Sequence, residues 1–414
     1  MSASTRFTSL AALAAAFVFL GSWAALHRGF YDDEEIVDIP VYRTYGDAIE
    51  RGSIPYRDFR LEYPPGALPV FALPALASSD GNEVEFRRAF ERLMAAFGVA
   101  AVLLAGLLLA GLGASRVRVV AALGASALFP LLLGNVLLTR FDLWPAALTL
   151  AALAALVWRR DRLGFGLLGL AVAAKLYPAV LVPLALSYVW RRRGRREALV
   201  CLGVLAGLVA LAFLPFLVLA PDGLAYSFGR QLGRPLQIES LGSSFFLAAH
   251  HLFGLGIEMR SGHGSQNLDG AGPAVAGVVL SVAQLATLVW IWLRRPASAE
   301  ELVRWSAAAL VAFVALGKVL SPQFLIWLAP LVPLAAGRRG LRASALLALA
   351  LALTQLWFPY RYWELALEFD LLASGLVLAR DLVLVAVLVV LVRKGAARNR
   401  IRRDADAGPT SVRS

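Results

Sequence analysis

The chain has 414 residues, of which 59% are hydrophobic, and its formal net charge is +12. Soluble domains are roughly 45–50% apolar, and the excess here comes in blocks of about twenty residues, the length that crosses about 30 Å of hydrocarbon. Arginines gather at the ends of these blocks, where they orient a chain in a bilayer, so the basic charge does not indicate nucleic-acid binding. A single cysteine, Cys201, excludes an intramolecular disulfide and a thiolate metal site.

The apolar blocks predict membrane-spanning helices from one end of the chain to the other. In order they cover 7–27, 92–113, 119–138, 141–158, 163–190, 197–219, 273–293, 302–317, 322–337, 342–357 and 371–392. The first block ends in His27 and Arg28 without a small-residue cleavage site, so we interpret it as a helix rather than a signal peptide. The breaks between blocks alternate in charge, and the positive-inside rule places the strongly basic set in the cytoplasm.

This alternation fixes an expected topology. Loops 28–91 and 220–272 face the exterior, both termini are cytoplasmic, and 393–414 forms a basic tail. The block at 163–190 has arginines beyond both ends, so its chain must turn back near Lys175, as two short half-helices or a re-entrant hairpin. We therefore predict an all-α polytopic membrane protein with about twelve passes, some of them short, forming one domain over 1–392.

The first exterior loop is dense in carboxylates, aromatic residues and turn residues between 31 and 66. Apolar residues recur at helical spacing from Val41 to Ile49, Asp38 stands where an N-cap would, and Gly52 suits the C-terminal cap. The pattern predicts a short amphipathic helix on the membrane surface. A carboxylate at a helix N-terminus is favoured in its ionised form, in which it can accept a proton.

Short motifs in three places resemble those of a known family. They are Asp38-x-x-x-Tyr42 with Pro55-Tyr56-x-Asp58-Phe59 and Tyr63-Pro64-Pro65, then Ala173-Ala174-Lys175-Leu176-Tyr177-Pro178, then Ser321-Pro322-Gln323-Phe324 with Trp327 and Pro330. Their order and content resemble the GT-C glycosyltransferases of family 87, the polyprenyl-phosphate-mannose-dependent mannosyltransferases and their arabinosyl relatives. Many members carry a histidine pair in the last motif where this chain has Gln323 and Phe324, so donor or acceptor choice is expected to differ.

The resemblance implies an enzyme of the bacterial plasma membrane that moves a mannose- or arabinose-type sugar from a polyprenyl-phosphate donor to a cell-envelope glycan or glycolipid. It implies an inverting single displacement outside the membrane with Asp38 as general base, and no metal or other cofactor. Candidate ligands of the donor phosphate are Lys175, Arg140, Lys318 and Arg361, which lie near exterior helix ends or within apolar blocks. Candidate acceptor and pocket residues are Tyr42, Asp58, Glu62, Tyr63, Asp142 and Gln323.

Several alternatives stay open at this point. Asp38 could be only a helix cap, and Lys175 could pair with Asp142 instead of binding phosphate. Arg140 and Asp142 could form a local ion pair, whereas Arg380 and Asp381 are adjacent on a helix and are assigned no role. A divalent cation could bind the acidic run Asp32, Asp33, Glu34 and Glu35.

A transporter or flippase of a lipid-linked sugar is the main rival function, because it would also place Lys175 at a broken helix. It would not need the large acidic exterior loop. A structural subunit of an envelope-assembly complex is a third possibility. Membrane lipids are expected partners in every case, and the sequence identifies neither the sugar, its linkage nor the acceptor.

Overall fold

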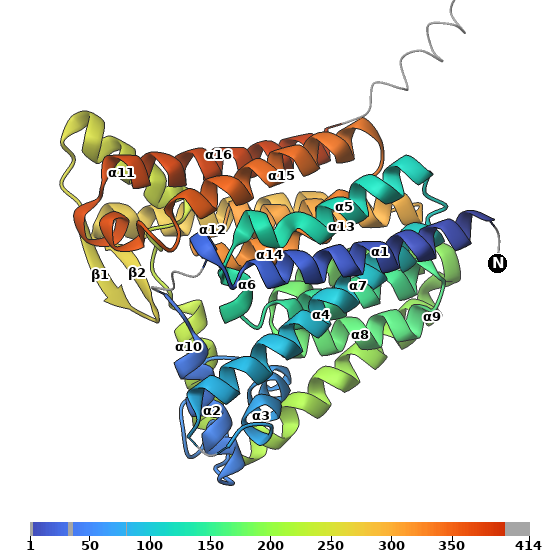
Figure 1. Cartoon of the computed structure of the whole chain (residues 1–414), viewed down its shortest axis with the longest axis horizontal. Helices are drawn as coiled ribbons and strands as arrows, with labels where there is room; N and C mark the ends of the chain where they lie inside the picture. The colour runs from blue at the N-terminus through green and yellow to red at the C-terminus, as the bar shows by residue number, and fades with distance from the viewer. Residues whose placement is uncertain (1–2, 32–35, 80, 394–414) are drawn as a thin grey trace, which may run out of the picture.

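The computed structural model describes residues 3–31, 36–79 and 81–393. Its long helices run side by side as a bundle (Figure 1). In chain order the first half contains α1 (Ala3–Ala25), α2 (Ile39–Glu50), α3 (Leu68–Leu76), α4 (Glu83–Gly111), α5 (Arg116–Leu133), α6 (Val136–Thr139), α7 (Leu143–Val157), α8 (Asp161–Ala174) and α9 (Val182–Leu219). The second half contains α10 (Pro221–Leu232), α11 (Leu241–Phe253), β1 (Glu258–Gly262), β2 (Ser265–Asp269), α12 (Ala271–Trp292), α13 (Ala299–Ala315), α14 (Leu325–Leu328), α15 (Gly337–Trp357) and α16 (Leu371–Val392).

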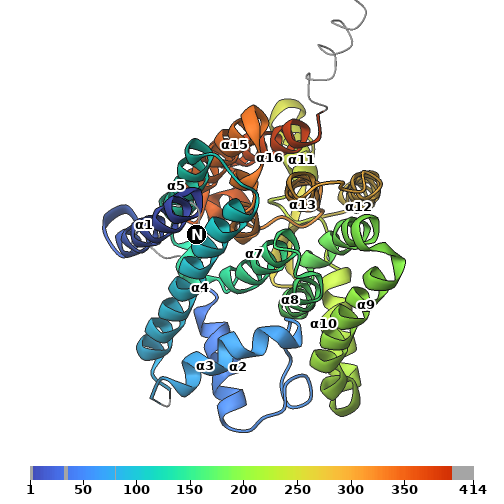
Figure 2. The same ribbon diagram turned by 90° about the vertical axis from the view of Figure 1, so that its right-hand side faces the viewer.

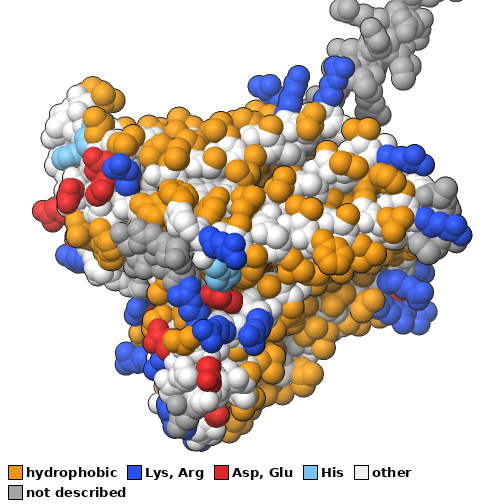
Figure 3. All heavy atoms as spheres, viewed as in Figure 1, with side chains coloured by type: hydrophobic (Ala, Val, Ile, Leu, Met, Phe, Trp, Pro, Cys, Tyr) orange, Lys and Arg blue, Asp and Glu red, His pale blue; other side chains and the backbone are white. Residues whose placement is uncertain are grey.

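Within the described residues, seven helical segments are long and apolar enough to cross a membrane, and hydrophobic side chains cover the sides of the bundle (Figure 3). Shorter apolar helices lie at Pro65–Leu76, Leu143–Val157 and Pro322–Leu334. The prediction of an all-α polytopic membrane protein is confirmed, and the figure of about twelve passes stays a prediction.

The predicted turn inside block 163–190 is present. Helix α8 stops at Ala174, a 3₁₀ turn occupies Tyr177–Leu181, and α9 then begins and kinks at Gly194, where φ is +85°. The carboxylate of Asp161, at the start of the block, pairs with Arg192 and Arg193 beyond its end, the latter at 3.2 Å. The two ends of the block therefore lie close together. The sequence predicted this, because arginines beyond both ends place both ends on the same side of the membrane.

Helix α2 is the amphipathic helix expected in the first loop. Asp38 occupies its N-cap position, although its side chain makes no cap hydrogen bond, and Gly52 follows the helix with φ +82°. Ile39, Tyr42 and Tyr45 form its buried face. In Figure 2, α2 and α3 lie below α4 at one side of the bundle, while α9 and α12 lie at its periphery.

The sequence patterns did not predict the antiparallel hairpin of β1 and β2. Its register pairs Glu258 with Asp269 and Gly262 with Ser265. His263 and Gly264 in the two-residue turn have φ of 56° and 70°, the left-handed values that a tight type I′ hairpin turn needs. The hairpin places its turn beside the cavity described next.

Candidate functional site

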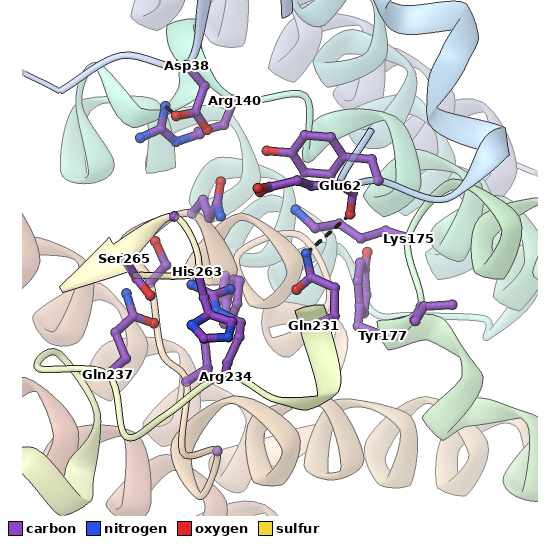
Figure 4. Close-up of a pocket in the computed structure, with 18 of the residues that line it drawn as sticks. Asp38, Glu62, Arg140, Lys175, Tyr177, Gln231, Arg234, Gln237, His263 and Ser265 are labelled. Carbon is purple, nitrogen blue, oxygen red and sulfur yellow. Dashed lines mark hydrogen bonds and ion pairs between the residues drawn. The ribbon is translucent and has the colours of Figure 1, made fainter. Parts of the chain in front are cut away.

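A cavity of about 630 Å³ lies between loop 28–91, the α8–α9 break, α10, the hairpin and the segment after α13. Figure 4 shows charged and amide side chains from these elements pointing into it. The side chains with a polar group on its wall are Asp38, Tyr45, Glu62, Tyr63, Arg140, Lys175, Tyr177, Ser227, Gln231, Arg234, Gln237, Glu239, His263, Ser265, Gln284, Lys318, Ser321, Gln323, Trp327 and Tyr362.

Asp38 is held on this wall by two donors. Arg140 Nη1 lies 3.0 Å from Asp38 Oδ1, and the Tyr42 hydroxyl donates to Oδ2 at 3.2 Å. Arg140 is buried, whereas the Asp38 side chain keeps 30% exposure. Burial, with the neighbouring Tyr63 and Asp38, raises the pKa of Tyr42 well above its ordinary value, so its hydroxyl remains a donor at neutral pH. The positive charge of Arg140 therefore balances the negative charge of Asp38, whose side chain makes no helix-cap hydrogen bond.

Lys175 forms the second ion pair of the cavity. Its Nζ donates to Asp142 Oδ1 at 2.6 Å, and Trp327 Nε1 donates to the same oxygen at 2.5 Å. The ammonium group also lies 4.6 Å from the centre of the Phe141 ring. The alternative that Lys175 pairs with Asp142 is confirmed. A local Arg140–Asp142 ion pair is wrong, because Arg140 has extended backbone and reaches Asp38 instead.

Two further cations line the cavity without such a partner. Lys318 Nζ donates to the carbonyl of Leu232 at 3.1 Å, and among the described residues neither Lys318 nor Arg234 has a carboxylate oxygen within 4 Å. Burial lowers the pKa of Lys318, and the nearby positive charge of Arg234 lowers it further. Burial likewise lowers the pKa of Arg234. An anion beside these two groups would offset their mutual repulsion.

Glu239 adds a buried carboxyl group on the same side. Its side chain is 2% exposed, and burial raises its pKa to about 7 against the opposing effects of Arg380 and Arg234. Gln237 Nε2 donates to Oε1 at 3.2 Å. Glu62 is different, because Arg230 Nε lies 2.7 Å from its Oε1 and ties loop 28–91 to α10.

The family model of glycosyltransferase family 87 matches residues 61–322, well over half of the chain. This protein belongs to glycosyltransferase family 87. No curated protein matches its sequence. The family 87 match makes the protein a glycosyltransferase, and its long apolar helices make it a membrane protein.

Two solved structures are similar to this family 87 protein at low identity. One is ArnT from Cupriavidus metallidurans bound to undecaprenyl phosphate, with 14% identity, a TM-score of 0.48, and coverage of 94% of this chain and 77% of ArnT. The other is the apo oligosaccharyltransferase of Archaeoglobus fulgidus, with 15% identity, a TM-score of 0.45, and coverage of 93% of this chain and 55% of that chain.

The cavity of the family 87 protein gathers most of the residues that the sequence analysis proposed. Asp38, Glu62, Tyr63, Arg140, Lys175, Lys318 and Gln323 line it. Tyr42 and Asp142 lie behind the wall, where they contact Asp38 and Lys175.

Two of the proposed residues lie away from the cavity wall. Arg361 pairs with Glu364 at 2.7 Å, one helical turn away on its own segment. Asp58 pairs with Arg57 at 2.9 Å and accepts from the backbone N–H of Ile54, closing its own turn.

A divalent-cation site at the acidic run was one of the open alternatives. The acidic run at 32–35 lies outside the described residues. Within the described ranges, no group of three or more His, Cys, Asp or Glu side chains could hold a metal ion.

Sequence reasoning missed Arg234, Gln237, Glu239 and Tyr362, because no motif marks them and only the fold brings 234–239 to the first loop. The available signal was a cluster of polar residues in the second exterior loop.

Proposed function

We propose that this protein transfers a mannose- or arabinose-type sugar from a polyprenyl-phosphate donor to a hydroxyl of a cell-envelope glycan or glycolipid, on the exterior face of the bacterial plasma membrane. The observation that carries the proposal is the Asp38 carboxylate on the wall of a cavity that also holds Lys318 and Arg234, two cations with no carboxylate oxygen within 4 Å among the described residues. Family membership supports a glycosyl transfer. The cations Lys318 and Arg234 on the cavity wall support an anionic glycolipid as its ligand.

The reaction is an inverting single displacement. The acceptor hydroxyl oxygen attacks the anomeric carbon, its proton passes to Asp38, and the bond from the anomeric carbon to the phosphate oxygen breaks. The bonding electrons leave with polyprenyl phosphate. Arg140 and Tyr42 orient the Asp38 carboxylate, which has further lone pairs beyond these two contacts with which to take the proton.

The departing phosphate is assigned to Lys318 and Arg234. Both line the cavity, and within the described residues neither has a carboxylate within 4 Å. Arg140 and Lys175 are each accompanied by a carboxylate, at 3.0 and 2.6 Å, and their positive charge is largely offset before a ligand binds. Cationic groups aimed at developing phosphate charge stabilise the transition state, and we propose that they do so without a metal ion.

The test is transfer by the purified protein in liposomes, with polyprenyl-phosphate mannose or arabinose and envelope glycan acceptors. Asp38→Asn should lower kcat by about 100-fold or more, the range expected for loss of a general base. Glu50→Gln is the matched control, because Glu50 is an exposed carboxylate at the far end of the same helix, and it should keep wild-type kcat.

Full activity of Asp38→Asn would refute the assignment of the base. If the wild type moves lipid-linked sugar across the bilayer and transfers none of it, the protein is a flippase instead.

A further inference from the structure

The segment 236–240, between α10 and α11, is fixed from three directions. Its backbone N–H groups donate to the carbonyls of Lys318 at 2.9 Å and Gln266 at 3.0 Å. The carbonyl of Glu239 accepts from Arg380 Nη2 of α16 at 2.7 Å. A loop anchored to a strand, to a second loop and to a helix holds its side chains in defined positions, as a binding site requires.

The anchor on α16 is itself unusual. Arg380 and Asp381 are fully buried and pair through Nε and Oδ1 at 2.7 Å, and Ser244 of α11 donates to Asp381 at 2.6 Å. A buried ion pair is often no more stabilising than apolar residues of similar volume, so its energy alone does not explain it. What the pair visibly does is hold the carbonyl of Glu239 and the first turn of α11 in place.

Three buried oxygen atoms of cavity-lining side chains have no hydrogen-bond partner within the described part of the chain. They are Glu239 Oε2, Gln237 Oε1 and Gln323 Oε1. A buried acceptor left unpaired costs about 1–3 kcal/mol. The two amide oxygens accept hydrogen bonds, and so does Glu239 Oε2 when the carboxyl is ionised, so the ligand that satisfies them is a compact body with several donors. A sugar ring with its hydroxyl groups fits this need, whereas a phosphate does not.

We propose that Glu239, together with Gln237 and Gln323, binds the hydroxyl groups of a sugar ring, and that Arg380 is a positioning residue for Glu239. The proposal rests on the proposed function in taking a glycolipid as the ligand of the cavity. Gln237 is bonded through its backbone to Lys318, the cation assigned to phosphate. The ring that these residues bind is therefore the one joined to the phosphate, the sugar of the donor.

The test measures equilibrium binding to the full chain in lipid nanodiscs, with three probes. They are farnesyl phosphate carrying mannose or arabinose, farnesyl phosphate alone, and octyl mannoside as a sugar without phosphate. Glu239→Gln should weaken binding of the sugar-bearing phosphate about tenfold, the order expected for one charge-assisted hydrogen bond. Binding of farnesyl phosphate alone should stay within twofold.

Asp269→Asn is the matched control, because it removes a carboxylate of the adjacent hairpin that pairs with Arg260 at 2.7 Å and does not line the cavity. The pairwise apolar exchange Arg380→Met with Asp381→Leu removes both buried charges together. It should weaken binding of the sugar-bearing phosphate as Glu239→Gln does while the unfolding temperature is kept. Combined with Glu239→Gln it should add no further loss.

Weaker binding of octyl mannoside, with unchanged binding of the sugar-bearing phosphate, would overturn the assignment of the bound ring to the donor. An equal loss for farnesyl phosphate, or no loss for any probe, would overturn the proposal. Glu239→Asp, which keeps the charge, serves as a second variant if Glu239→Gln does not fold, and is read by the same criteria. A wild type that binds the probes in this pattern but transfers no sugar would refute the proposed function and leave the sugar site intact.

Discussion

Asp142 is a single residue on which the position of the broken helix beside the cavity depends. Its Oδ1 accepts from both Lys175 and Trp327, its side chain is fully buried, and that of Lys175 is 14% exposed. Lys175 is also the residue at which α8 ends. The pair thus fixes the broken helix beside the cavity, and either charge left alone would lie in a medium of low dielectric constant.

We predict that Asp142→Asn lowers the free energy of unfolding by about 3–5 kcal/mol, because Lys175 then stays buried without its counter-charge. Denaturant unfolding in detergent measures this. The control is Glu197→Gln, which breaks the more exposed pair with Arg162 at 2.9 Å and should cost at most about 1 kcal/mol. Similar losses for the two variants would contradict a structural role for the Asp142 pair.

At the scale of single residues, the sequence identified the charged side chains but not the groups with which they form ion pairs. Adjacent residues on a helix do not face one another, which argued against any role for Arg380 and Asp381. The structure nevertheless joins them at 2.7 Å, because the long arginine side chain folds back while its other nitrogen reaches Glu239. Pairing of this kind depends on distant segments, and no local spacing rule contains that information.

At the scale of elements, loop 28–91 meets α8 by a close backbone contact. A Cβ added to Gly66 would lie 2.5 Å from the carbonyl carbon of Ala173 and 2.6 Å from the nitrogen of Ala174. Trp144 Nε1 donates to the carbonyl of Gly66 at 3.1 Å. The contact lies directly before Lys175, so it sets the distance between the loop that carries Asp38 and the broken helix.

Gly66→Ala should therefore destabilise the protein by about 1–3 kcal/mol, as overpacking does, and should lower transfer activity as well because Lys175 shifts. Gly203→Ala is the control. Gly203 lies in α9 with nothing within 4 Å of an added Cβ, and alanine there should leave stability unchanged or raise it by up to about 1 kcal/mol. Thermal unfolding and transfer assays measure both variants. Equal behaviour of the two would exclude a tight contact at Gly66.

Elements with strong periodic or charge signals were predictable. Arginines at both ends of block 163–190 required the hairpin of α8 and α9, and capping residues located α2. The hairpin of β1 and β2 gave no such signal, since its strands are short and polar and lack the alternation of a half-buried strand. Because that hairpin anchors the Glu239 segment, the part of the cavity wall formed by Arg234, Gln237 and Glu239 was not predictable from the sequence.

At the scale of the whole molecule, the basic breaks meet one another. Arg118 pairs with Glu300 and donates to the carbonyl of Leu334, and Arg191 donates to the carbonyl of Arg295 at 3.3 Å. These contacts join three breaks and the end of block 322–337, which lie far apart in the chain. Their clustering supports the assignment of all of them to one side of the membrane, which the positive-inside rule makes the cytoplasm.

Cysteine labelling in intact cells tests this orientation. The native Cys201 is buried, so Cys201→Ala provides a background without thiols. In it, Ser79→Cys in loop 28–91 should react with a membrane-impermeant maleimide, because the loop is exterior. Ala297→Cys, in the basic break beside Arg295, should react only after the cells are permeabilised, since the basic residues hold that break in the cytoplasm. The reverse pattern would place the cavity on the cytoplasmic side, where a donor exposed to the cell exterior could not reach Asp38.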